Sequence, residues 1–160
     1  MKSIAVKTNA IRILTQKKAE FQVLSYDPPD NVPSGTEVAE ILGKDPASVF
    51  KTLVTAGKSG EHYVFMIPVT AELDLKKAAE AVGEKNIVML KAKDLLELTG
   101  YVHGGCSPVG MKKQFVSVLD QSAEKKDAIV LSGGKIGVHI EIAPGELRKA
   151  VPFSAANLTC

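Results

Sequence analysis

Hydrophobic residues recur with the spacing of a helix face in several short segments of the chain. One segment follows Thr8 and carries Ile11 and Leu14, and another follows Asp74 and ends before Gly83. Threonine and aspartate cap the first turn of many helices, and glycine ends many last turns. These signals predict short helices at residues 9–18, 36–42, 75–82, 93–98 and 144–150.

Other segments alternate between apolar and polar residues or form short apolar runs, as β-strands do. Residues 50–55 and 62–67 are two such runs with a glycine-containing stretch between them, and they predict a β-hairpin. Strands come in series with helices interspersed, and not in regular strand–helix–strand alternation. The pattern predicts a single domain over residues 1–160, of the α/β class and the α+β type. Its other strands are expected at 21–24, 87–90, 114–119, 128–131 and 137–142.

The composition is that of an ordinary folded chain. Its 160 residues are 45% hydrophobic and 24% charged, which suits one domain with a hydrophobic core. Twenty Lys and Arg against 18 Asp and Glu give a net charge of +2, and only Arg12 and Arg148 are arginines. So weak a positive charge gives no support for sequence-independent binding to a nucleic-acid backbone. Any contact with RNA is therefore expected to be local and of low intrinsic affinity.

Neither membrane insertion nor disulfide bonding is indicated. The longest apolar run, residues 64–69, is far shorter than the ~20 residues of a membrane span, and residues 1–7 lack the apolar stretch of a signal peptide. Cys106 and Cys160 are too few for a disulfide framework, so both are expected to be reduced thiols. We therefore expect a cytoplasmic protein.

Lys51 is a charged residue inside an otherwise apolar predicted strand. Because side chains alternate along a strand, Lys51 shares one face with Leu53, and Phe50 and Thr52 share the other. Lys51 therefore lies either at a solvated edge of the sheet or in a pocket. Alternation alone favours the solvated edge.

Two glycine-rich segments could also carry chemistry. Residues 100–110 contain four glycines, including Gly104 and Gly105, and backbone N–H groups in such a loop can bind an anion or a developing oxyanion. The alternative is a plain connection between two strands. Gly133 and Gly134 fit a hairpin turn between two strands, although the two segments together could line one pocket.

A cysteine nucleophile and a metal site are weaker alternatives. His103 lies three residues before Cys106, but neighbours in a loop need not face each other, and no further Cys or His completes a zinc set. His139 alternates with apolar residues and shares a face with Glu141, so a structural pair is expected there. No metal site is expected, and Cys106 is not favoured as a nucleophile.

The chain resembles the YbaK/EbsC-type family, which is related to the editing domain of bacterial prolyl-tRNA synthetases. The resemblance implies an α/β fold of the α+β type, with a mixed, mostly antiparallel, partly barrel-like sheet and flanking helices. It also implies that neither a metal nor an organic cofactor is used. The order and spacing of several short motifs carry it: Tyr26-Asp27, residues 50–53, residues 75–79, Gly100-Tyr101, Gly104-Gly105, Ser107-Pro108, Gly110, residues 132–135 and residues 141–144.

The same resemblance assigns roles to six residues. Lys51 looks like the family's essential lysine, and Gly104 and Gly105 look like the loop whose amides face the substrate carbonyl, so these three are the expected catalytic residues. The expected substrate-binding residues are Tyr26, Thr52 and Ser132. A lysine suits the phosphate end of an aminoacyl-adenosine, and loop amides suit an oxyanion. On this basis Lys51 is expected in a pocket, against the preference from alternation.

The implied activity is hydrolytic editing of misacylated tRNA. The expected substrate is Cys-tRNA(Pro), with Cys-tRNA(Cys) as a second candidate, and the substrate's own thiol would attack the ester and release a thiolactone. The expected partners are misacylated tRNA, bound at its aminoacyl-adenosine end, and prolyl-tRNA synthetase as a candidate, with no membrane and no DNA. Removal of alanine from Ala-tRNA(Pro) by water and a non-catalytic module that binds aminoacyl-tRNA or a synthetase remain alternatives.

Overall fold

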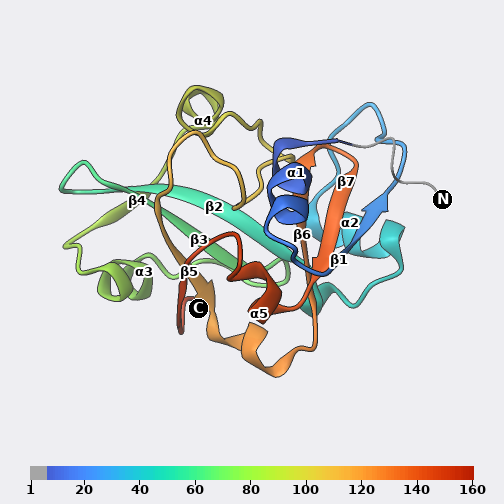
Figure 1. Cartoon of the computed structure of the whole chain (residues 1–160). Helices are drawn as coiled ribbons and strands as arrows, with labels where there is room; N and C mark the ends of the chain where they lie inside the picture. Colours follow the sequence, from blue (N-terminus) through green and yellow to red (C-terminus); the bar gives the residue numbers. More distant parts are fainter. Residues whose placement is uncertain (1–6) are drawn as a thin grey trace.

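Two β-sheets joined at one corner frame the computed structural model, which describes residues 7–160 (Figure 1). In the first sheet the order is β1 (Phe21–Ser25), β7 (Val138–Ile142) and β6 (Ile129–Lys135), and both pairs are antiparallel. A parallel bridge between Val49 and Val130 connects it to the second sheet. The second sheet has the order β4 (Ile87–Met89), β2 (Phe50–Gly57), β3 (His62–Pro68), β5 (Val116–Asp120) and β8 (Ser154–Ala156).

Antiparallel pairs outnumber parallel ones among these strands. The hairpin of β2 and β3 forms as predicted, and β4 adds to β2 in the antiparallel sense. Only the pairs of β3 with β5 and of β5 with β8 are parallel. The α+β fold with mixed, mostly antiparallel strands and flanking helices is therefore confirmed, but the strands divide into two sheets where one partly barrel-like sheet was expected.

The helices lie on the outside of these sheets (Figure 1), and several of the predicted capping residues do begin or end them. Thr8 caps α1, Asp74 caps α3, and Gly43 and Gly83 adopt the left-handed conformation after the helices that they end. No helix within the described part of the chain is long and apolar enough to cross a membrane. The helices are α1 (Asn9–Gln16), α2 (Gly35–Leu42), α3 (Leu75–Val82), α4 (Ala92–Thr99) and α5 (Pro144–Leu147), with 3-10 turns η2 (Pro46–Ser48) and η3 (Gln121–Lys125).

The main hydrophobic core lies where the two sheets approach each other. Phe50 and Met66 from the second sheet pack in one cluster with Leu131 and Ile140 from the first, and Leu14 of α1 closes it. Separate clusters form under α3 and beside α4. α2 packs elsewhere, on the outer side of the corner, where Ala39 contacts the Val49–Val130 bridge. α2 therefore covers this side of the corner.

Several predictions of local structure are wrong. Gly133 and Gly134 are not a turn: β6 continues through them to Lys135 with an irregular register, and Gly137, at a φ of 90°, lies in the actual turn. The last helix ends at Leu147, earlier than expected, and β8 was not predicted. The expected absence of a signal sequence concerns residues 1–7, of which 1–6 lie outside the described residues.

Gly35 is required where α2 approaches β3. A Cβ added at Gly35 would meet Val69 Cγ1 and lie 2.6 Å from Val69 Cβ. We expect Gly35→Ala to lower the free energy of unfolding by about 1–2 kcal/mol, because one of the two elements must move. Gly145→Ala is the matched control. Gly145 lies in another helix, α5, and nothing lies within 4 Å of the Cβ that this substitution adds. Urea titrations that find Gly35→Ala as stable as Gly145→Ala would contradict this packing.

Candidate active site

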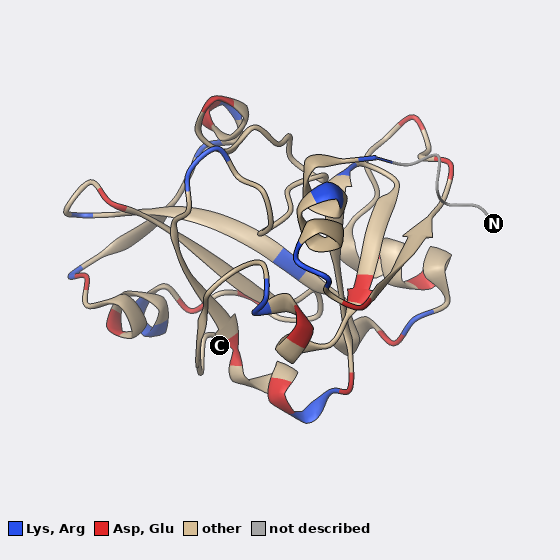
Figure 2. Ribbon diagram, viewed as in Figure 1, with Lys and Arg blue, Asp and Glu red and all other residues tan. Residues whose placement is uncertain are grey.

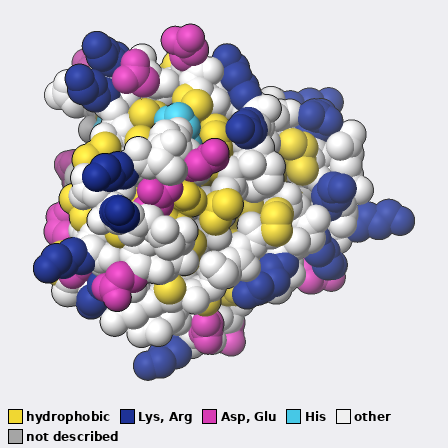
Figure 3. Space-filling model, turned by 90° about the vertical axis from the view of Figure 1, so that its left-hand side faces the viewer, with side chains coloured by type: hydrophobic (Ala, Val, Ile, Leu, Met, Phe, Trp, Pro, Cys, Tyr) yellow, Lys and Arg dark blue, Asp and Glu magenta, His cyan; other side chains and the backbone are white. Residues whose placement is uncertain are grey.

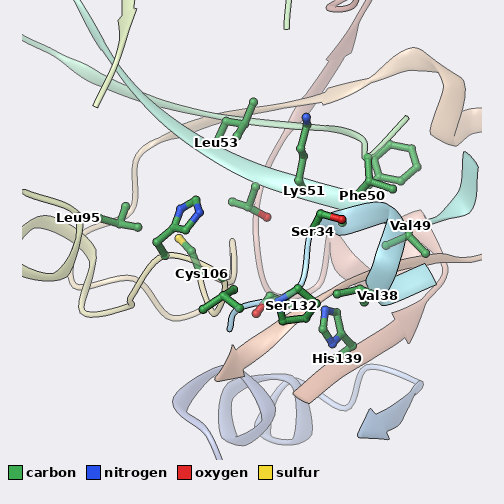
Figure 4. A pocket seen from close by; sticks show the side chains of 17 residues that line it. Ser34, Val38, Val49, Phe50, Lys51, Leu53, Leu95, Cys106, Ser132 and His139 are labelled. Carbon is green, nitrogen blue, oxygen red and sulfur yellow. The ribbon is translucent and has the colours of Figure 1, made fainter. Parts of the chain in front are cut away.

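A cavity of about 220 Å³ opens at the corner between the two sheets, under the start of α2. Its walls come from the segment before α2, from β2, from the glycine-rich loop after α4, and from β6 and β7 (Figure 4). The apolar part includes Val38, Val49, Leu53, Val69 and Leu95. The polar and sulfur-containing side chains of the lining are Ser34, Lys51, Thr52, His103, Cys106, Ser132 and His139.

Lys51 and Ser132 both line the cavity, although the two residues are far apart in the sequence. Val49 bridges Val130 across the corner, which brings the beginning of β2 close to β6. Figure 4 shows Lys51 and Leu53 projecting from the same side of β2. Lys51 is half-buried and lines the cavity. The strand alternation favours a position at a solvated edge of the sheet, and the structure does not show this.

The charge of Lys51 is not neutralised by a neighbouring carboxylate. Within residues 7–160 the ion pairs join Lys44 to Glu141 and Lys149 to Glu146. No Asp or Glu is among the residues that line the cavity. A half-buried cation without a counter-ion attracts an anionic group, because its interactions are less screened than those of an exposed charge. The cavity is therefore suited to a ligand that carries a phosphate or a carboxylate.

Two buried polar atoms of the cavity wall lack hydrogen-bond partners. They are Thr52 Oγ1 and His139 Nδ1, and in the described chain no other buried side-chain nitrogen or oxygen is left without one. An unsatisfied buried polar group costs about 1–3 kcal/mol. Both exceptions belong to residues that line the same cavity, which is what a site completed by a ligand would show.

The glycine-rich loop places its two adjacent glycines differently. Gly104 lines the cavity with a φ of 87°, and an added Cβ would lie 2.6 Å from Val32 Cγ1. Gly105 is buried behind it, and its N–H donates to the carbonyl of Val102 at 2.9 Å. A Cβ on Gly105 would lie 2.9 Å from the backbone nitrogen of Ile136. Of the two amides expected to face a substrate, that of Gly105 is bound within the loop, and only Gly104 is among the residues that line the cavity.

Ser132 and Tyr26 contribute in different ways. The Ser132 hydroxyl lines the cavity and accepts a hydrogen bond from the N–H of Gly134 at 3.2 Å, which leaves its own proton free to be donated. Tyr26 is not among the residues that line the cavity. Its ring stacks on that of His139, with centroids 5.9 Å apart and planes inclined by 24°, so it supports the wall from behind.

Comparison with known proteins identifies the family of this chain. The model of the aminoacyl-tRNA editing domain matches residues 30–150, which include Lys51, Thr52, Gly104, Gly105 and Ser132. The chain belongs to the aminoacyl-tRNA editing domain family. Its expected resemblance is confirmed.

Two relatives and one solved structure show how far this editing domain extends. A protein of Enterococcus faecalis with the provisional name Cys-tRNA(Pro)/Cys-tRNA(Cys) deacylase EbsC is 46% identical over 153 residues, which are 96% of this chain and 93% of that protein. A proline–tRNA ligase of Kosmotoga olearia is 28% identical over 138 residues, 78% of this chain but 24% of the ligase. A crystal structure described provisionally as a trans-editing enzyme for prolyl-tRNA synthetase is 25% identical, with a TM-score of 0.83 over 97% of this chain and 99% of that one.

Cys106 lies in the cavity wall of this editing domain as a buried, protonated thiol. It is 7% exposed and packs in a cluster with Val54, Leu95 and Tyr101. Burial raises the pKa of Cys106 to about 12. Because the thiolate is the reactive form of cysteine, Cys106 is a poor nucleophile at neutral pH. The neighbouring His103 is exposed, whereas Cys106 is buried.

Alkylation kinetics test this environment. At pH 8 the raised pKa of Cys106 reduces its thiolate fraction about 1,000-fold relative to an ordinary cysteine, so iodoacetamide should label the exposed Cys160 first. In Cys160→Ala the folded protein should remain unlabelled until denaturant is added. Labelling of that variant at the rate of a free thiol would show that Cys106 is accessible and ionised.

His139 was missed as a site residue. The structural pair with Glu141 does not form, because Lys44 binds that carboxylate at 3.1 Å while the His139 ring turns toward Tyr26. Within residues 7–160 no group of three or more His, Cys, Asp or Glu could hold a metal ion. Alternation placed His139 and Glu141 on one face correctly, but no feature of the sequence showed that the ring would border a cavity.

Proposed function

We propose that this chain is a trans-editing deacylase that releases cysteine from Cys-tRNA(Pro), with Cys-tRNA(Cys) as a second candidate substrate. Membership of the aminoacyl-tRNA editing family indicates the class of reaction. The observation that carries the proposal is the cavity itself, which combines an unpaired Lys51 with two unpartnered polar atoms and has no acidic residue. Such a site complements an uncharged ester linked to a phosphate.

The site residues divide the binding of an aminoacyl-adenosine between them. The ammonium group of Lys51 holds the terminal phosphate, and the Gly104 N–H donates to the ester carbonyl as negative charge develops on its oxygen. Thr52 and Ser132 offer hydroxyl groups to the ribose and the aminoacyl group. Gly105 contributes indirectly to binding. Because it has no side chain, the loop can pack on Ile136, and this packing positions Gly104 at the cavity.

The reaction needs no enzyme nucleophile if the substrate's own cysteine thiol attacks. The sulfur forms a bond to the ester carbonyl carbon, the bond from that carbon to the ribose oxygen breaks, and the thiol proton passes to the leaving ribose hydroxyl. The products are a cyclic thiolactone and free tRNA. Confinement in a small cavity favours this step because it holds the substrate thiol near the carbonyl. The protonated state of Cys106 is consistent with an enzyme that provides no nucleophile of its own.

Charge on the rest of the molecule predicts little affinity for the body of the tRNA. Basic and acidic residues are both spread over the fold (Figure 2), and on the face drawn in Figure 3 basic, acidic and hydrophobic side chains are intermixed. A partner that binds tRNA would supply the missing affinity. We propose prolyl-tRNA synthetase for this role and a cytoplasmic location for the reaction.

Single-turnover deacylation tests the function directly. The purified full chain is mixed with proline tRNA charged with cysteine, alanine, serine or proline, and with cysteine tRNA charged with cysteine. We expect rapid loss of cysteine and slow loss of proline. Loss of alanine in preference to cysteine would indicate the water-dependent branch of the family, whereas binding of charged tRNA without release would favour a non-catalytic module.

A further inference from the structure

An open groove of about 540 Å³ lies outside the candidate active site, between α4 and the second sheet. Leu90, Leu98 and Phe115 form its apolar floor together with the ring of His62. None of the residues that line this groove also lines the candidate active site. The roles proposed above therefore leave the groove without a function.

The apolar floor continues as a row of residues to the edge of the sheet. Val88 of β4 pairs with Ala56 of β2, and Ala56 pairs with His62 of β3. The parallel register of β3 and β5 places Phe115 next, and the ring centroids of His62 and Phe115 are 5.8 Å apart. Residues side by side on neighbouring strands point to the same face of a sheet. Val88, at the end of this row, is 51% exposed, so the row presents apolar surface to a partner.

The two walls of the groove carry opposite charges. Asp94 and Glu97 of α4 line one wall, and Lys112 and Lys113, in the segment before β5, line the other. None of the four takes part in either of the two ion pairs found in residues 7–160. Lys112 Nζ donates to the main-chain carbonyl of Glu97 at 3.2 Å, and Lys113 Nζ lies 5.9 Å from the centroid of the Phe115 ring. Neither contact neutralises a charge.

This arrangement of charges selects among possible occupants. A nucleic acid or an acidic peptide would be repelled by the acidic wall, and a basic segment would be repelled by the lysines. An acidic wall, an apolar floor and a basic wall are complemented by a surface with the same three parts in the reverse order. The same groove turned by 180° has that order, as the self-complementary patch of a two-fold interface requires.

We propose that the chain forms a two-fold symmetric dimer through this groove. The acidic wall of each copy, Asp94 and Glu97, faces the basic wall of the other, Lys112 and Lys113. The apolar rows that end in Val88 pack between these charges, which gives the interface an apolar centre and a charged rim. The dimer does not depend on the proposed deacylation, because it uses none of the residues that line the candidate active site.

Exchange of charges between two variants tests the dimer. Both walls are acidic in Lys112→Glu/Lys113→Glu and basic in Asp94→Lys/Glu97→Lys, so each variant alone should be a monomer. An equimolar mixture of the two brings opposite charges together again and should form a heterodimer. Sedimentation velocity measures the masses at about 100 μM chain, well above the micromolar Kd of a weak specific interface. About 50 mM NaCl keeps the screening of exposed charges low.

Two further variants complete the test. Lys76→Glu/Lys125→Glu makes the same change in net charge at exposed lysines outside the groove and should stay dimeric like the wild type. Val88→Asp places a charge in the apolar row and should weaken dimerisation about 10-fold. Recovery of the dimer in the mixture cannot result from unfolding, so it supports the proposal. A monomeric wild type, a mixture that stays monomeric beside a dimeric wild type, or a dimer that persists in all the groove variants would overturn it.

Discussion

Replacing Lys51 by alanine is expected to lower the single-turnover rate of Cys-tRNA(Pro) deacylation by about 100- to 1,000-fold. Lys51 is the single cationic side chain in the lining of a cavity that has no acidic residue. Its ammonium group therefore has no competing partner there and is available to the phosphate of the substrate. Without it, the aminoacyl ester is held less firmly against the Gly104 amide, and the thiol loses its alignment with the carbonyl.

Two further variants separate charge from shape. Lys51→Met keeps an unbranched side chain of similar length without the charge, and it should be as impaired as Lys51→Ala. Lys58→Ala, in the exposed turn between β2 and β3, removes a lysine outside the cavity and should keep the wild-type rate. Rates are compared at an enzyme concentration below saturation, where both binding and chemistry contribute. Deacylation by Lys51→Met at the wild-type rate would show that the charge has no part in the reaction.

Local signals predicted most of the elements because they act within a few residues. Thr8 and Asp74 cap their helices with side-chain hydrogen bonds, and Gly83 ends its helix in the left-handed conformation. The hairpin of β2 and β3 followed from two apolar runs of similar length. Gly133 and Gly134 were misassigned because a contact distant in the sequence decides their structure. The Thr8 hydroxyl donates to the carbonyl of Gly133 and helps to hold that stretch in β6.

The candidate site was predicted only in part, because its residues come from elements that are distant in the sequence. Lys51, Thr52, Gly104 and Ser132 do line one cavity, but only a family resemblance brought together residues from β2, the loop and β6. The two loop glycines differ because the Gly105 N–H donates a hydrogen bond to the carbonyl of Val102 and is therefore not available to a ligand. Such a bond, like the cavity beside His139, is a product of tertiary packing and leaves no periodicity in the sequence.

His139 should also make the protein sensitive to acid. Its pKa is about 4 in the folded protein, against an ordinary value of 6.5, because burial disfavours the charged ring. Between these two values the unfolded chain binds more protons than the folded one, so a falling pH favours unfolding. The stability that follows from the neutral ring is complete above pH 6.5 and is lost as the pH falls toward 4. The loss expected from this residue between pH 7.5 and pH 4 is about 3 kcal/mol.

Denaturant titrations of the wild type and of His139→Phe across this range measure that contribution. Glu37, Glu84 and Glu146 have lowered pKa values because they accept hydrogen bonds in the folded state, and they also reduce stability in acid. They are present in both proteins, so their effect cancels in the difference between the two curves. The free energy of unfolding of His139→Phe should therefore fall less steeply below pH 6.5. Parallel curves would mean that His139 is protonated equally easily in the folded and unfolded states, which would contradict the effect of burial on its pKa.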